Sequence, residues 1–187
     1  MQLNLTIIRA QAGCETAFKQ VYETFSATTL SYLSQLGVQR QDLDDVQQHI
    51  WLSVYKQLHT LSSPYAFKRW LLRIAHHSAY KKLKEPKEVE ITEELMASLT
   101  LIDEHLDSEY SLDMLEVLPR HFREVIYLFY WLDLSCAEIG MICNLPTNTV
   151  KSRLFHARNK LADSAHIKHL KQERSHDEPT QSVTATN

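Results

Sequence analysis

Residues 134–161 read LSCAEIGMICNLPTNTVKSRLFHARNKL, and this stretch decides the fold class. Ser135 and Glu138 have the spacing of a capping box, which predicts the start of a short helix. A turn at residues 143–146 ends that helix, and a second helix is expected to start near Thr147. Apolar residues of the second helix recur at helical spacing and share one face: Val150, Leu154, Ala157 and Leu161. The pattern predicts a helix-turn-helix.

The outer face of this second helix is polar and basic. Residues 146–160 contain four basic residues and no acid. Side chains at the start of such a helix can reach base edges in the major groove, while lysine and arginine neutralise phosphates. The alternative is an αα-hairpin with a solvated charged face. The candidate DNA contacts are Thr147, Asn148, Thr149, Lys151, Ser152, Arg153, Phe155, His156 and Arg158.

A second basic helix is predicted over residues 66–84. It carries six basic residues, two histidines and no acid, with Trp70 and Tyr80 interleaved. Cations that bind phosphates, next to rings that stack on bases, suit single-stranded or opened DNA. The alternative places Trp70 in the core and leaves the charges on a solvated face.

An acidic helix precedes it, over residues 42–58. Asp45, Gln48 and Leu52 share one surface of this helix at i, i+3 and i+7. Aspartate near a helix start is most often a cap or a partner of the helix dipole. As a functional surface, this face suits a protein partner with a basic, helical face.

Composition excludes several classes of protein. The chain has 187 residues, of which 44% are hydrophobic and 23% charged, and a formal net charge of −3. Three glycines leave no Gly-rich phosphate loop, and no apolar run is long enough to span a membrane. Three cysteines without paired spacing suit a reducing compartment, and the first residues lack a basic signal-peptide start. We therefore expect a cytoplasmic protein with no direct membrane insertion.

The helical periodicity predicts an all-α protein of two small helical domains joined by an acidic linker. Residues 86–118 hold ten acidic residues and one basic residue, which separates two mildly basic blocks. The expected organisation is a lead-in at 1–14, a first domain at 15–85, a linker at 86–110, a second domain at 111–165 and a polar, disordered tail at 166–187.

Taken in order, these segments resemble the sigma-70 family of bacterial transcription initiation factors, in particular its short extracytoplasmic-function (ECF) group. Residues 42–55 resemble the helix that docks on core RNA polymerase, and FKRWLLRIA at 67–75 resembles the promoter-melting helix. Residues 118–126 and 134–158 resemble the helix-turn-helix domain that reads the upstream promoter element. The similarity extends from residue 9 to about residue 165.

The resemblance implies a sigma factor, not an enzyme, without a cofactor. Such a factor binds core RNA polymerase, recognises the −35 and −10 promoter elements and promotes DNA melting to start transcription of a stress- or signal-responsive gene set. An anti-sigma factor is the expected regulatory partner, beside core polymerase and promoter DNA. The helix at 147–158 would read the upstream element.

The resemblance also implies two further sets of site residues. Downstream-element binding and melting fall to Ser62, Ser63, Tyr65, Lys68, Arg69, Arg73, His76, His77, Tyr80, Lys81 and Lys84. Core polymerase binding falls to Asp42, Asp44, Asp45, Gln48, His49 and Leu52. Asp133 stands at a turn position where the family often has glycine, and aspartate tolerates the left-handed conformation.

Three other interpretations stay open at this point. The first is an enzyme or a metal centre, which would have to use the ten histidines and three cysteines. These residues show no recognisable ligand spacing, so neither is expected. A repressor or activator that uses only the helix-turn-helix would leave the other two helices without a role. A sigma-like adaptor would act through protein contacts alone. A repressor binds duplex DNA alone, whereas a small sigma factor binds its promoter well only together with core polymerase, so the dependence of promoter binding on polymerase distinguishes them.

Overall fold

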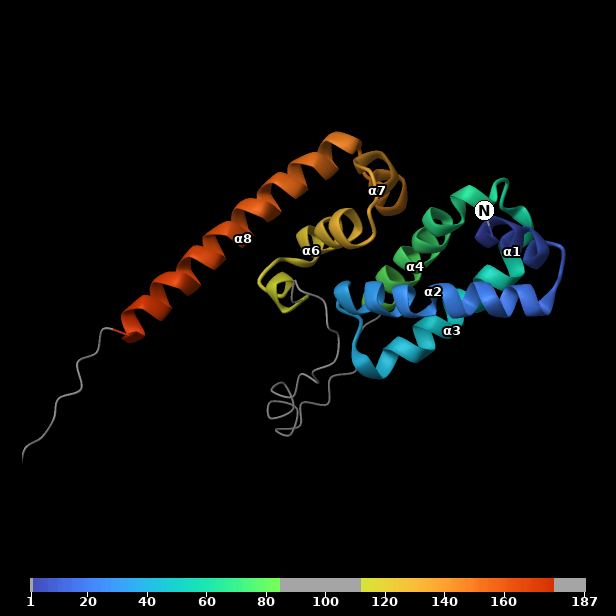
Figure 1. The fold of residues 1–187 in the computed structure, drawn as a ribbon, viewed down its shortest axis with the longest axis horizontal. Helices are drawn as coiled ribbons and strands as arrows, with labels where there is room; N and C mark the ends of the chain where they lie inside the picture. Colours follow the sequence, from blue (N-terminus) through green and yellow to red (C-terminus); the bar gives the residue numbers. More distant parts are fainter. Residues whose placement is uncertain (1, 85–111, 177–187) are drawn as a thin grey trace, which may run out of the picture.

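The computed structural model describes residues 2–84 and 112–176, and every regular element in these two ranges is helical (Figure 1). The predicted all-α class is confirmed. The α-helices are α1 (Gln2–Gln11), α2 (Glu15–Gln35), α3 (Arg40–Gln57), α4 (Phe67–Lys84), α6 (Arg120–Ile126), α7 (Cys136–Cys143) and α8 (Thr147–His176). Between them lie the 3-10 helices η1 (Leu58–Thr60), η2 (Pro64–Ala66) and η4 (Leu112–Leu115), and a π-helix, η5 (Tyr127–Trp131).

Helices α1 to α4 form a first helical unit. The apolar stripes of α2, α3 and α4 meet in a common core, as their spacing predicted. Helix α1 joins this core, because it packs on α2 and buries Ile7 and Ala10. The Gln11 amide donates to the carbonyl oxygens of Leu58 and Leu61, at 3.2 and 2.8 Å. The segment expected as a lead-in is therefore part of the packed unit.

Helices α6, α7 and α8 form a second unit around the predicted helix-turn-helix. The capping box is present: the Glu138 backbone N–H donates to Ser135 Oγ at 3.3 Å, and the Ser135 N–H donates to Glu138 Oε2 at 3.0 Å. Asn144 ends α7 in the left-handed conformation with φ 54°. Asp133 likewise has φ 51°, the conformation that its place in the sequence suggested.

Gly140 lies where α7 meets the turn before α8. A Cβ atom at this position would lie 2.7 Å from the carbonyl oxygen of Leu145, closer than side chains approach a backbone oxygen. The Leu145 N–H donates to the Gly140 carbonyl at 2.9 Å. The absence of a side chain at Gly140 therefore lets the turn close on α7 and sets the direction of α8.

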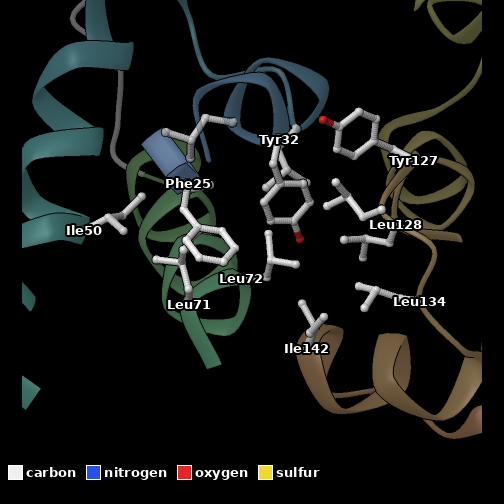
Figure 2. Close-up of a cluster of buried hydrophobic side chains, with 14 of the residues drawn as sticks. Phe25, Tyr32, Ile50, Leu71, Leu72, Tyr127, Leu128, Leu134 and Ile142 are labelled. Atoms are coloured by element: carbon white, nitrogen blue, oxygen red, sulfur yellow. The ribbon is translucent and has the colours of Figure 1, made fainter. Parts of the chain in front are cut away.

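The two units share one core. Figure 2 shows Tyr32 and Leu72 of the first unit beside buried side chains of the second, which include Leu128 and Ile142. Helix α4 packs against α7, and α2 packs against α6. The rings of Tyr32 and Tyr127 stack with their centroids 6.2 Å apart. Helices α6 and α7 of the second unit thus lie directly on α2 and α4 (Figure 1).

Helix α8 extends further than its apolar pattern predicted. The tail from residue 166 was expected to be disordered, but the helix continues to His176. Lysine, glutamine, glutamate and arginine in residues 168–174 are good helix formers, so the backbone helix propagates without an apolar stripe. The acidic linker at 86–110 and the last residues of the tail lie outside the described ranges. Within those ranges, no helix combines the length and the apolar character needed to cross a membrane.

Candidate nucleic-acid interface and docking surface

The start of α8 is anchored by one face and exposed on the other. Val150, Leu154 and Ala157 are buried against the rest of the second unit. Lys151 and Phe155 lie on the opposite face, where the Phe155 side chain is 58% exposed. A large apolar ring this exposed beside basic residues is available to a partner. Most of the predicted upstream contacts share this exposure: Thr147, Asn148, Lys151, Ser152, Phe155, His156 and Arg158.

Two predicted contacts of α8 also take part in packing. Arg153 and Thr149 are half-buried. Burial, and after it the positive charge of Arg153, lowers the pKa of His121 on α6. His156 stacks on Phe122 of α6, with ring centroids 6.4 Å apart. The exposed face of α8 is therefore held by α6 along one edge.

On helix α4, unlike on α8, only some of the predicted DNA contacts are exposed. Arg73, His77, Lys81 and Lys84 are exposed, whereas the other predicted contacts on this helix turn toward the second unit. The Lys68 ammonium donates to the carbonyl oxygen of Leu132 at 2.6 Å. The Arg69 guanidinium lies 3.8 Å from the Glu138 carboxylate of α7. Part of the basic surface that was predicted to bind DNA is therefore engaged within the protein.

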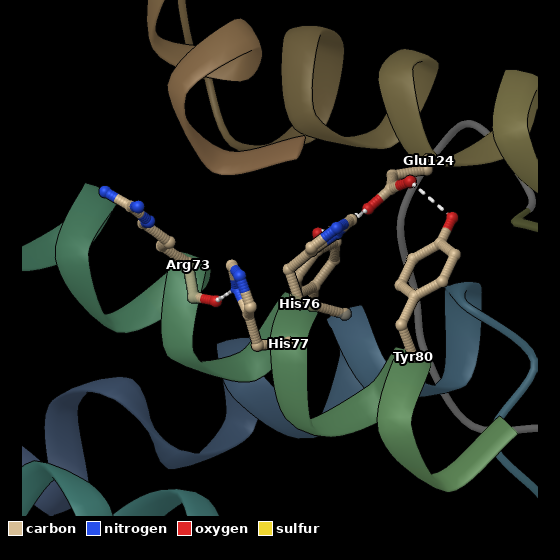
Figure 3. A network of polar contacts seen from close by, with 6 residues as sticks. Arg73, His76, His77, Tyr80 and Glu124 are labelled. Atoms are coloured by element: carbon tan, nitrogen blue, oxygen red, sulfur yellow. Dashed lines mark hydrogen bonds and ion pairs between the residues drawn. The ribbon is translucent and has the colours of Figure 1, made fainter. Parts of the chain in front are cut away.

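Glu124 of α6 is the centre of the polar contacts between the units (Figure 3). Its side chain is 1% exposed. His76 Nδ1 lies 2.7 Å from Glu124 Oε1, and the Tyr80 hydroxyl donates to Oε2 at 3.0 Å. The buried hydroxyl of Tyr32 on α2 donates to Oε1 at 2.7 Å. The Glu124 carboxylate of the second unit thus accepts hydrogen bonds from two hydroxyl groups of the first unit. It also pairs with the His76 imidazole, which likewise comes from the first unit.

These contacts decide the charge state of Glu124. Burial by itself raises the pKa of a carboxyl group, but the hydrogen bonds from His76, Tyr32 and Tyr80 outweigh burial and hold the pKa of Glu124 below its ordinary value. Burial, and next the adjacent carboxylate, raises the pKa of the Tyr32 and Tyr80 hydroxyls. The two tyrosines consequently stay protonated and can donate hydrogen bonds. The buried negative charge of Glu124 is therefore stabilised by its hydrogen-bond partners.

The loop between η1 and α4 carries three of the residues predicted to bind the downstream element. Tyr65 is 83% exposed, Ser62 is exposed and Ser63 is half-buried. Beside them a hollow of about 370 Å³ is lined by α1, by α2, by the start of α4 and by η5. Its lining includes Tyr65, Lys68 and Trp131. Both helical units therefore contribute to this hollow.

The acidic helix α3 borders an apolar groove. Asp44, Gln48 and Leu52, three of the predicted docking residues, line a hollow of about 400 Å³ between α2 and α3. Asp45 and His49 are exposed, and His49 Nδ1 lies 2.8 Å from the Asp45 carbonyl oxygen. Asp42 differs, because its carboxylate pairs with Lys82 of α4 at 3.3 Å.

The sequence analysis missed the aromatic lining of this groove. Phe18, Tyr22, Trp51 and Tyr55 supply the aromatic part of the lining, and the Tyr55 side chain is 62% exposed. Phe18 and Tyr22 fit the helical apolar spacing of α2, which by itself favours a place in the core for both. Tyr55 lies one helical turn after Leu52, so its position beside an exposed leucine was the available signal. Glu124 was missed as well, although it is an acid next to the buried Val125 and Ile126.

Two family models match the chain. The model described as Sigma-70 region 2 matches residues 21–87, which include α3 and α4. The model described as Sigma-70, region 4 matches residues 109–161, which include the helix-turn-helix. The basic helix with its loop and the basic helix-turn-helix thus fall in two separate regions of one family.

Curated relatives match along most of the chain. ECF RNA polymerase sigma factor SigW of Bacillus subtilis is 25% identical over 178 residues, which cover 86% of this chain and 95% of the relative. The ECF RNA polymerase sigma-E factor of Escherichia coli K12 is 28% identical over 176 residues, 82% of this chain and 88% of the relative.

Solved structures share the fold. CnrH in complex with the cytosolic domain of CnrY has a TM-score of 0.64 at 21% identity, covering 88% of this chain and 97% of that one. The sigma factor RpoE of Bartonella quintana, in complex with the anti-sigma factor NepR, has a TM-score of 0.61 at 20% identity, covering 78% and 94%. With both regions matched in order and relatives aligned along most of its length, this chain belongs to the sigma-70 family, in the ECF group of RNA polymerase sigma factors.

Proposed function

We propose that this sigma factor reads the upstream, −35 promoter element with the exposed face of α8. The single observation that carries this assignment is the exposure of Lys151, Phe155 and Arg158 on a helix whose opposite face is buried. A rigid helix with exposed polar and basic side chains at its start fits the major groove. The second domain, at residues 111–165, is the upstream-reading module of this proposal.

The downstream, −10 element is assigned to α4 and the loop before it, in the domain at residues 15–85. Arg73, His77, Lys81 and Lys84 supply a basic exposed face for the phosphates of opened DNA. Tyr65 and the hollow beside it offer a place for an extruded base. Lys68, Arg69, His76 and Tyr80 become available to DNA only when the second unit moves off α4.

Core RNA polymerase is assigned to the groove between α2 and α3. Asp44 and Gln48 stand at its edge, and Leu52 and Tyr55 expose apolar surface to it. An apolar centre with acidic residues at its rim fits a helical partner with a basic surface. Asp45 and His49 extend that rim, whereas Asp42 contributes through its pairing with Lys82, which ties α3 to α4.

Regulation and location complete the proposal. RpoE of Bartonella quintana is known in complex with an anti-sigma factor, and an anti-sigma factor is the corresponding partner proposed for this chain. The protein acts in the cytoplasm, where polymerase and promoters are, and starts transcription of a stress- or signal-responsive gene set. The acidic linker at 86–110 connects the two promoter-reading domains.

Run-off transcription tests the assignment. Core bacterial polymerase is incubated with pooled genomic fragments, with and without the protein, and discrete new transcripts that start at aligned sites are expected. Lys151→Ala should reduce transcription from these promoters by about tenfold, because it removes one DNA contact of α8. Lys160→Ala, further along the same helix, is the matched control and should have a smaller effect.

A second variant separates polymerase binding from promoter reading. Asp45→Lys should weaken binding to core polymerase in a pull-down while leaving promoter preference unchanged, and Glu23→Lys on α2 makes the same charge change as a control. Loss of polymerase binding in Lys151→Ala would overturn the assignment of α8. Tight binding of duplex promoter DNA without polymerase would favour a stand-alone repressor.

A further inference from the structure

Three side chains with metal-binding chemistry meet where the two helical units pack. His76 comes from α4, Glu124 from α6 and Cys143 from α7. One donor atom of each lies within 4.8 Å of the donor atoms of the other two. Figure 3 shows His76 and Tyr80 pointing from α4 toward Glu124. The spacing in the sequence predicted no such cluster, because each residue stands on a different helix.

The cluster is buried and chemically mixed. Glu124 is 1% exposed, Cys143 is 8% exposed and the His76 side chain is 12% exposed. A thiol, an imidazole and a carboxylate are the three donor types that zinc takes in proteins. One zinc ion holds sulfur at about 2.3 Å and nitrogen at about 2.0 Å, so donors this close are near the spacing that a single ion spans.

We propose that His76, Glu124 and Cys143 form a binding site for a divalent cation of the zinc type, which clamps the second helical unit onto α4. Two of the three ligands come from the second unit and one comes from the first. The bound cation would join α6 and α7 to the helix assigned to promoter melting. Cation binding would therefore stabilise the arrangement in which His76 and Tyr80 face the protein and not DNA.

The charges of the cluster balance with a divalent cation. Cysteine ligates metals as the thiolate and histidine as the neutral imidazole, so a bound cation requires the loss of the Cys143 thiol proton. A cation displaces that thiol proton to solvent. Carboxylate, thiolate and divalent cation then sum to zero with a neutral imidazole, which removes the cost of a second buried negative charge.

Two tyrosines support the carboxylate ligand. The hydroxyls of Tyr32 and Tyr80 donate to Glu124 at 2.7 and 3.0 Å, one to each oxygen. Carboxylates that ligate metals are commonly oriented by such hydrogen bonds, and their loss weakens metal binding by about 10- to 100-fold. Neither hydroxyl needs to give up its bond to Glu124 when His76 exchanges its contact for the cation.

Cobalt titration of the reduced, metal-free full chain tests the site, because Co²⁺ replaces zinc and absorbs light. We expect one equivalent of Co²⁺ to produce a thiolate-to-cobalt charge-transfer band, which an added equivalent of Zn²⁺ removes. Cys143→Ser should lose the band, and His76→Gln should weaken binding by about tenfold or more. Tyr80→Phe, which keeps all three ligands, should weaken binding by about tenfold.

Matched controls stand next to the ligands. His77→Gln changes the adjacent exposed histidine, and Cys136→Ser changes the other cysteine of α7. Both should bind Co²⁺ like the parent protein. A wild-type protein without a charge-transfer band, or a band that persists in Cys143→Ser, would overturn the proposal. Circular dichroism of each variant shows that loss of the band is not loss of the fold.

The clamp itself has a separate readout. Zinc should slow amide hydrogen exchange in α4, α6 and α7 of the parent protein, and this protection should be absent in Cys143→Ser. Exchange that is unchanged by bound zinc would overturn the clamp. Because these measurements use neither DNA nor polymerase, their failure is distinct from failure of the proposed promoter recognition, which transcription assays without added zinc test.

Discussion

Helices α4 and α8 are both basic, both carry aromatic side chains and both are assigned to promoter DNA, yet they present these groups differently. The start of α8 turns its basic face outward and buries only its apolar face. Helix α4 turns one basic edge outward and the other toward the second unit, where Glu124 and Glu138 meet it. Charge pattern alone thus locates both candidate interfaces, but packing decides which one is accessible.

The difference bears on mechanism. Under the proposed assignment, promoter reading by α8 requires no rearrangement of its own unit, whereas full use of α4 requires the contacts with Glu124 and Leu132 to break. The polar contacts at this interface engage side chains of α4 that the proposal assigns to DNA. A partner or cation that strengthens the interface therefore acts against the proposed melting function and leaves α8 exposed.

Among the substitutions that test the difference between α4 and α8, Glu124→Ala is expected to have the largest effect on stability. The variant leaves the buried Tyr32 hydroxyl, the half-buried Tyr80 hydroxyl and His76 without their acceptor, so we expect the metal-free protein to lose about 4 kcal/mol of unfolding free energy. Urea denaturation measures the loss, and hydrogen exchange should show α4 opening first. Glu116→Ala, an exposed acid in the same unit, should change stability by less than about 0.5 kcal/mol. Equal stability of the two variants would contradict the importance of the network.

The two faces of α8 can be separated by adjacent substitutions. Leu154 is 2% exposed, so Leu154→Ala should cost about 3 kcal/mol of stability through the cavity that it leaves. Phe155 is 58% exposed, so Phe155→Ala should change stability by less than about 0.5 kcal/mol while weakening promoter binding by the polymerase complex. Thermal denaturation and gel-shift assays measure the two effects. A destabilised Phe155→Ala would place that ring in the core.

The direction of α8 depends on the turn at Gly140. A methyl group there would meet the Leu145 carbonyl oxygen at 2.7 Å, so Gly140→Ala should cost about 2 kcal/mol and reduce upstream recognition. Met141→Ala, at an exposed neighbouring position, is the control. Chemical denaturation together with run-off transcription measures both consequences. A stable Gly140→Ala variant with normal promoter use would show that the turn has room to adjust.

The smallest effect is expected at the helix cap. Ser135→Ala should cost about 1 kcal/mol at neutral pH, since it removes the cap of α7. The Ser135 hydroxyl holds the pKa of Glu138 below its ordinary value, so this contribution is present above the ordinary pKa and disappears as pH falls through the lowered one. The difference between parent and variant should shrink in acid, as urea denaturation at several pH values measures. A difference that is constant with pH would contradict the role of Glu138.

Local patterns in the chain were enough for most of the architecture. Apolar residues at helical spacing located the buried faces of α2, α3 and α4, because one face of each helix must leave water. Ser135 and Glu138 located the start of α7, because a cap is satisfied within four residues. The exposed half of the α8 site followed from the same periodicity, since the residues between the buried positions face outward.

Contacts between distant segments were not available from these patterns. Glu124 looked like an ordinary surface acid, and its burial depends on Tyr32, His76 and Tyr80, which come from helices far away in the chain. The aromatic lining of the α3 groove likewise needs α2 and α3 side by side. The prediction was also wrong for residues 166–176, which were expected to be disordered because they lack an apolar stripe. They are helical, because the backbone helix of α8 propagates into them.

The sequence by itself determined most of the helices, the cap of α7, the helix-turn-helix and the sigma-70 character of the chain, because periodicity, turn chemistry and family motifs depend on residues that are neighbours in the chain. Only the tertiary structure decided that the second unit packs on α4, that Glu124 is buried among donors and that part of a predicted DNA face is covered. The physical reason is that burial and pairing depend on which helices meet, and that is set by the sum of many contacts between segments distant in the chain.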